Sequence, residues 1–108
     1  MENKTILITG GASGIGLALV EKFASQGSTV FFIDSNALLG KQVEKEFQEK
    51  GKPVTFLEVD IREESQVQHA IQSIPSKLDV LINNAGISHI GNLASTSLAD
   101  FERLFAVN

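Results

Sequence analysis

The sequence alternates short apolar runs with amphipathic segments, and this alternation limits the fold more than any other feature. Four runs fit buried strands, at 4–9, 29–33, 54–59 and 78–82. The segments between them have helical periodicity and end at Gly27, at Gly51 with Pro53, and at Pro75. Strands that are apolar on both faces belong to parallel sheets covered by helices on both sides. We therefore expect a doubly wound α/β fold, because right-handed crossovers fix the topology.

Four helices are predicted from apolar residues that recur every three or four positions. The predicted buried face of the first helix comprises Ile15, Leu19 and Phe23. The faces of the next two comprise Leu39, Val43 and Phe47, then Val67, Ala70, Ile71 and Ile74. A fourth helix is expected after Ser97, with Leu98, Phe101, Leu104 and Phe105. The order is β-α-β-α-β-α-β-α without linker or repeat, so 1–108 is expected to form one domain.

Charge and composition argue against several classes of protein. The formal net charge of −4 disfavours a nucleic-acid or anionic-membrane partner, since those surfaces select basic patches. No apolar run approaches the roughly 20 residues that a membrane span needs. The sequence has no cysteine, and His69 and His89 alone cannot form a convincing metal cluster, so no metal site is expected. We expect a cytoplasmic protein.

The segment after the first strand reads Thr-Gly-Gly-Ala-Ser-Gly-Ile-Gly, from Thr9 to Gly16. A side chain at Gly10 would obstruct the turn, one at Gly14 would keep the backbone from a pyrophosphate, and Gly16 lets the helix pack closely. Free N–H groups of the first helical turn, with the helix dipole, form an anion site. The contacts are expected to include Ser13 and Ile15. Three glycines alone also fit a tight, well-packed turn without a ligand.

Asp34 follows the second strand, where a carboxylate can accept hydrogen bonds from the ribose hydroxyls of adenosine. It would repel a 2′-phosphate, and no Arg or Lys stands at Ser13 or Ser35 to attract one. We therefore expect NAD in preference to NADP, bound by a Rossmann-type fold. Asp34 could instead cap the helix that begins near Ser35, and both roles can coexist.

The spacing Thr-Gly-x-x-x-Gly-x-Gly resembles the fingerprint of the short-chain dehydrogenase/reductase family. Asp60-Ile61 resembles its adenine-contacting pair, and Asn83–Gly86 resembles its Asn-Asn-Ala-Gly motif. Asn108 stands where the family has an asparagine of the catalytic site. The four features match in order and spacing over the whole chain. The resemblance implies an NAD-dependent oxidoreductase that transfers hydride between nicotinamide and a small alcohol or ketone, with a homodimer or homotetramer as the usual assembly.

The resemblance also implies individual roles. Asp60 would bind the adenine amino group, Ile61 would offer its backbone, and Asn83 would mainly stabilise the central sheet. Taken alone, Asp60 could be a turn residue before Arg62, and two asparagines at a strand end are natural loop formers. The residues implied to line the path of the cofactor are Asn84, Ala85 and Gly86.

Asn108 is the candidate catalytic residue. It follows Phe101, Leu104 and Phe105 at helical spacing, which predicts a polar amide on an apolar helix face. An unsatisfied polar group there costs about 1–3 kcal/mol, so water, backbone or an active-site network must satisfy it. The resemblance implies that its backbone holds a water of the proton relay. The alternative is that Asn108 caps the end of the helix.

This sequence departs from the family in its catalytic residues. The family uses a serine, a tyrosine and a lysine four residues after the tyrosine, whereas this sequence contains no tyrosine. We expect a truncated, inactive cofactor-binding portion in which the strand at 80–82 forms an unprotected apolar edge. Such a chain should be marginally folded and bind NAD weakly or not at all. A non-catalytic nucleotide-binding or interaction module, and a dimer that completes the sheet, are the alternatives.

Overall fold

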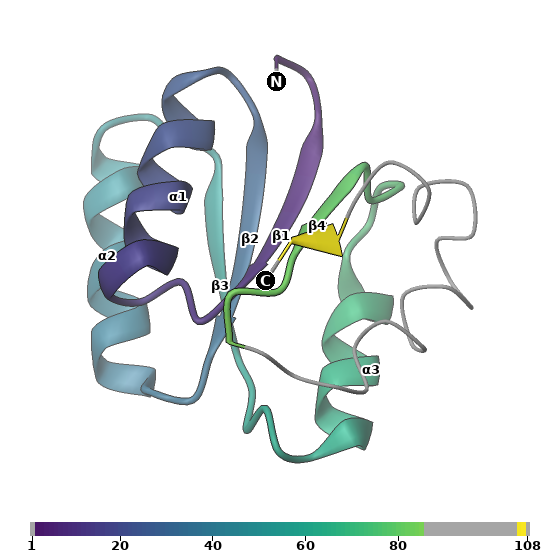
Figure 1. The fold of residues 1–108 in the computed structure, drawn as a ribbon. Helices are drawn as coiled ribbons and strands as arrows, with labels where there is room; N and C mark the ends of the chain where they lie inside the picture. Colours follow the sequence, from purple (N-terminus) through teal and green to yellow (C-terminus); the bar gives the residue numbers. More distant parts are fainter. Residues whose placement is uncertain (1, 86–105, 108) are drawn as a thin grey trace.

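The computed structural model describes residues 2–85 and 106–107, which form a parallel sheet with helices on both faces (Figure 1). The sheet has the order β3-β2-β1-β4-β5, and all neighbouring strands are parallel. The doubly wound α/β prediction is therefore confirmed. The helices are α1 (Gly14–Ser25), α2 (Ala37–Glu49) and α3 (Glu64–Ser73). The strands are β1 (Thr5–Thr9), β2 (Thr29–Asp34), β3 (Val54–Glu58), β4 (Val80–Ile82) and β5 (Ala106–Val107).

Two apolar layers hold the helices on the sheet. In β1, Ile6 and Ile8 point into the layer under α1 and α2, whereas Leu7 points into the layer under α3. Figure 1 shows α1 and α2 on one side of the sheet and α3 on the other. Alternate residues of a strand face opposite sides, so a strand buried on both sides must be apolar at every position. This explains the continuous apolar run from Ile6 to Ile8.

The buried face of α1 lies one position away from the predicted one. Its buried residues are Gly16, Val20 and Ala24, whereas Ile15 is 72% exposed. Leu19 and Phe23 are half-buried and pack at the margin of the core. The prediction followed the largest side chains, but a small residue at Gly16 allows the first turn to lie close to the loop after β1. The predicted faces of the second and third helices are confirmed at Val43, Phe47, Val67, Ala70 and Ile71.

The predicted edge position of β4 is wrong. β4 pairs on one side with β1 and on the other with β5, with Leu81 opposite Ala106 and Ile82 opposite Val107. The same pairing contradicts a fourth helix that continues unbroken from Phe105 to Asn108. Backbone groups at an open strand edge need partners, and pairing with β4 here outweighs the local helical spacing. The rest of the predicted fourth helix, at 97–105, lies outside the described residues.

Candidate functional site

The glycine-rich turn leaves β1 at the carboxyl edge of the sheet. Gly10 has φ +71°, and its N–H donates to the carbonyl oxygen of Ile33 at 2.8 Å, which ties the turn to the end of β2. Gly14 has φ +60°, a conformation that other residues adopt only at a cost. A Cβ added at Gly16 would overlap the carbonyl oxygen of Gly10. Gly16 therefore allows the first turn of α1 to approach the loop, as predicted, although the group it approaches belongs to the turn itself.

The N-terminus of α1 is open. Its N-cap residue, Ser13, makes no side-chain hydrogen bond to the first helical turn. A Cβ added at Gly14 would meet no atom within 4 Å, so the backbone here faces open space. Ile15, the next residue, is also exposed. Uncapped N–H groups and an exposed isoleucine are the features expected where a phosphate and an apolar ligand surface meet a helix end.

Asp34 connects this turn to the next loop. Its Oδ2 accepts a hydrogen bond from the Ala12 N–H at 3.1 Å, and its Oδ1 accepts one from the Asn36 N–H at 3.0 Å. The N-cap of α2 is Asn36, whose Oδ1 accepts from the Leu39 N–H at 3.0 Å. Asp34 is therefore not the cap residue of α2. The half-buried carboxylate lies at the end of β2, beside the glycine turn. These two hydrogen bonds leave further acceptor positions of the carboxylate available.

The loop after β4 closes the other side of the turn. The Thr9 hydroxyl donates to Asn83 Oδ1 at 3.0 Å and accepts from the Ala85 N–H at 2.9 Å. The Asn84 amide nitrogen donates to the carbonyl oxygen of Gly10 at 3.3 Å. Asn83 is buried directly after β4, whereas Asn84 and Ala85 are half-buried beside the turn. Two motifs that lie more than 70 residues apart in sequence therefore form one structural unit.

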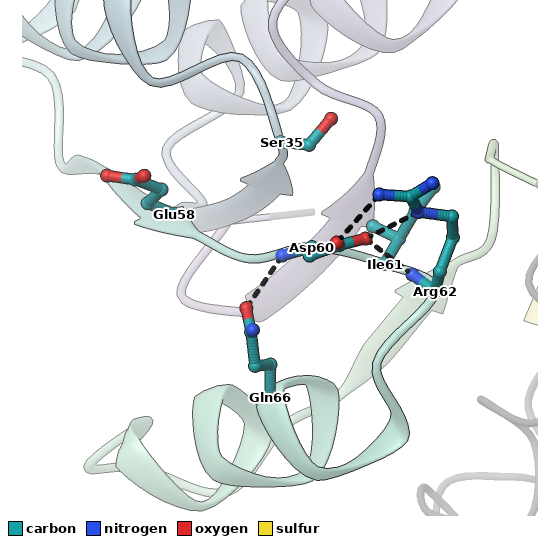
Figure 2. Close-up of a pocket in the computed structure, with 6 residues that line it drawn as sticks. All are labelled: Ser35, Glu58, Asp60, Ile61, Arg62 and Gln66. Atoms are coloured by element: carbon teal, nitrogen blue, oxygen red, sulfur yellow. Dashed lines mark hydrogen bonds and ion pairs between the residues drawn. The ribbon is translucent and has the colours of Figure 1, made fainter.

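Asp60 lines an open cavity of about 680 Å³ beyond the carboxyl end of β3. Figure 2 shows its carboxylate held by Arg62, with Nε 3.0 Å from Oδ1 and a terminal guanidinium nitrogen 3.0 Å from Oδ2. The Asp60 N–H donates to Gln66 Oε1 at 2.8 Å. Hydrogen bonds from the side chain and backbone of Arg62 lower the pKa of Asp60 below its ordinary 3.8. Asp60 is thus a turn residue beside Arg62, as the simpler alternative required, and still faces the cavity.

Most residues predicted for the site lie along one edge of the sheet. Parallel strands β1, β2, β3 and β4 end there, so the turn, Asp34, Asp60 and Asn84 are brought to the same side of the molecule. Ser35 and Ile61 line the cavity beside Asp60. Gly86 and Asn108 lie outside the described residues.

Sequence reasoning did not assign roles to Thr9 and Ala12. Thr9 is fully buried and links the glycine turn to the loop after β4, while Ala12 donates to Asp34. A signal for Thr9 was present in the sequence, because it is a polar residue that ends an otherwise apolar strand directly before Gly10. No comparable signal marks Ala12, because its contact is made by the backbone.

Between residues 2 and 85 and at 106–107, no three His, Cys, Asp or Glu side chains gather to hold a metal ion. In those segments, no helix combines the length and apolar character needed to cross a bilayer.

The chain belongs to the short chain dehydrogenase family, whose family model matches residues 4–108. It is 35% identical over 111 residues to a cyclopentanol dehydrogenase from Comamonas sp., covering 100% of this chain and 44% of that protein. It is 37% identical over 111 residues to a 3-beta-hydroxysteroid dehydrogenase from Comamonas testosteroni, covering 42% of that protein. The chain therefore spans less than half the length of these relatives.

Solved structures show the same fold. A short chain dehydrogenase/reductase from Burkholderia phymatum in complex with NAD superimposes with a TM-score of 0.70 at 27% identity, covering 75% of this chain and 30% of that one. A short chain dehydrogenase/reductase family protein, 34% identical, also gives a TM-score of 0.70 and covers 80% of this chain and 35% of that one. Both comparisons agree with the Rossmann-type sheet described above.

Proposed function

We propose that this chain is the NAD-binding portion of an oxidoreductase that interconverts an alcohol and a ketone. The observation that carries the proposal is the position of Asp34. Its carboxylate ends β2, bonds to the Ala12 N–H of the glycine turn and remains half-exposed beside the open end of α1. The glycine turn, which would bind the pyrophosphate, and Asp34, which would bind the ribose, are therefore joined by a direct hydrogen bond. Recognition of an adenine dinucleotide needs both groups side by side.

The residues present fit a dinucleotide. The open space at Gly14 and the uncapped turn that begins at Ser13 suit the pyrophosphate. Asp34 would accept the ribose hydroxyls, and the cavity at Asp60 and Ile61 would receive the adenine. The path toward the nicotinamide is assigned to Asn84, Ala85 and Gly86. When bound, the nicotinamide supplies the hydride acceptor or donor.

NAD is proposed in preference to NADP because a 2′-phosphate would meet the Asp34 carboxylate. Ser13, in the glycine-rich turn, and Ser35, directly after Asp34, carry no charge. Arg62 is a cation at the cavity, but its Nε and one terminal guanidinium nitrogen already donate to the Asp60 carboxylate. The NAD complex of the solved Burkholderia phymatum relative supports this choice.

The substrate class is proposed from the names of the relatives, which are dehydrogenases of cyclopentanol and of a hydroxysteroid. Both names point to hydroxyl groups on apolar rings. Asn108 is proposed to serve the proton relay, and proton donation by tyrosine is assigned to residues outside these 108. The homodimer or homotetramer stays a prediction for the full-length parent protein, and the cytoplasmic location stays a prediction as well.

Cofactor titration of Asp34→Asn tests the proposal. We expect NAD affinity to fall about tenfold or more, since charged hydrogen bonds are lost, whereas NADP affinity should rise, because the charge that repels the 2′-phosphate is removed. Glu46→Gln is the matched control, because it removes one carboxylate charge at an exposed position of α2 that does not line the cavity. An unchanged NAD-to-NADP affinity ratio in Asp34→Asn would rule out Asp34 as the selecting residue.

A further inference from the structure

The outer edge of β3 has no strand beside it within the part of the chain that the structure describes. On its inner side, the Pro53 carbonyl oxygen accepts from the Val30 N–H, and the Val59 N–H donates to the Asp34 carbonyl oxygen. Backbone groups alternate in direction along a paired strand, so those of Val54 and Phe56 point away from the sheet. An open edge of this kind is a template for pairing with another chain.

Side chains of α2 occupy this edge. Gln48 Nε2 donates to the Val54 carbonyl oxygen at 3.0 Å, and Glu44 Oε2 accepts from the Phe56 N–H at 2.7 Å. The Val54 N–H donates to the Lys52 carbonyl oxygen at 2.9 Å. One side chain therefore supplies a donor and the other an acceptor, each to the backbone group that needs it. The first three outward-facing groups of β3 are all bonded within the chain.

The spacing of the residues on α2 explains how they reach the strand. Gly40, Glu44 and Gln48 are four residues apart and lie on one face of the helix. A Cβ added at Gly40 would overlap the ring of Phe56, so glycine allows α2 to lie close to β3. Glu44 and Gln48, one and two turns further along, then come within hydrogen-bonding distance of the strand backbone.

We propose that Glu44 and Gln48 close the outer edge of β3 against strand pairing with a second copy of this chain. We name a second copy as the partner that is kept away because of the sequence of β3, which is Val-Thr-Phe-Leu-Glu. This strand has the β-branched and aromatic composition of self-pairing segments and contains no proline. Ordinary solvent-facing positions on a helix would not place a donor and an acceptor on matching backbone groups of a neighbouring strand. The proposal is independent of cofactor binding.

Hydrogen exchange and mass measurements on Glu44→Ala/Gln48→Ala test this role. We expect the Phe56 amide to exchange about tenfold faster than in the wild-type chain. The Val59 amide, which donates to β2, should keep its protection and report that the sheet is intact. Light scattering should show a mass that rises with concentration for the variant, whereas the wild type shows no such rise over the same range.

Two control variants sharpen the test. Gln42→Ala/Glu46→Ala removes the same residue types from exposed positions of α2 and should behave like the wild type. Glu44→Gln removes the charge but keeps an acceptor, so it should preserve Phe56 protection and the wild-type mass. The proposal is overturned if Phe56 exchange is unchanged in Glu44→Ala/Gln48→Ala, or if both double variants associate equally. If the double variant unfolds, Glu44→Ala and Glu44→Gln are compared, and equal Phe56 exchange in these two overturns it.

Discussion

The hydroxyl of Thr9 joins the two loops that form the candidate cofactor site. It donates to Asn83 in a buried bond and accepts from the Ala85 N–H in a partly buried one. Buried polar groups are costly when a partner is removed, because the group left behind cannot bond to solvent. Thr9 therefore acts as a positioning residue that sets the distance between the glycine turn and the loop after β4.

Thr9→Val should destabilise the chain by about 1–3 kcal/mol, since it keeps the shape of the side chain but removes both hydrogen bonds of the buried hydroxyl. Urea unfolding followed by circular dichroism measures this change. Thr55→Val is the matched control, because Thr55 is a half-buried strand residue outside these bonds, and it should change stability by less than about 0.5 kcal/mol. Equal effects of the two substitutions would contradict the role of Thr9.

The ion pair of Asp60 and Arg62 should make the stability of the chain depend on pH. Arg62 holds the pKa of Asp60 below 3.8. The contribution of the pair to the free energy of unfolding is therefore fully present above that value and is lost as pH falls through the lowered pKa. Arg62→Ala should raise the pKa of Asp60 back toward 3.8, as followed by NMR of its carboxyl carbon. Because both groups are exposed, the change in unfolding free energy should be small. Identical titration curves for the wild type and Arg62→Ala would show that the pair does not form.

At the level of elements, the strands were the most predictable part. Ile6 and Leu7 point to opposite faces of the sheet, and both faces are buried, so the strand is apolar from Ile6 to Ile8. This continuous apolar run is visible in the sequence. The face of α1 was less predictable, because Gly16 and Ala24 are buried through their small size rather than their hydrophobicity. β5 could not be predicted, since its pairing with β4 depends on a contact between distant segments. Backbone contacts such as that of Ala12 with Asp34 have no side-chain signal.

The two glycines at the start of α1 should respond differently to alanine. Gly16→Ala places a methyl group against the carbonyl oxygen of Gly10, so α1 must shift, and we expect a loss of at least about 2 kcal/mol. Gly14→Ala meets no atom and should cost about 1–2 kcal/mol for its positive φ alone. Thermal or urea unfolding of both variants checks the order. A larger loss in Gly14→Ala would contradict the close approach at Gly16.

At the level of the whole molecule, the structure removes one reason for expecting a marginal fold. β4 is covered by β5, and the outer edge of β3 is bonded to side chains of α2. Weak NAD binding remains the prediction, because the chain matches less than half the length of its relatives. The site described here would hold mainly the adenosine and the pyrophosphate.

The central claim is that the carboxyl edge of the sheet binds an adenine dinucleotide. NMR titration of the labelled chain with NAD, up to millimolar concentration, tests it most directly, because shift changes locate even weak binding. We predict saturating changes at the amides of Gly14, Ile15 and Asp34 and around Asp60, with smaller changes for NADP at equal concentration. Absence of saturating changes at these amides, or changes confined to another face of the molecule, would contradict the account.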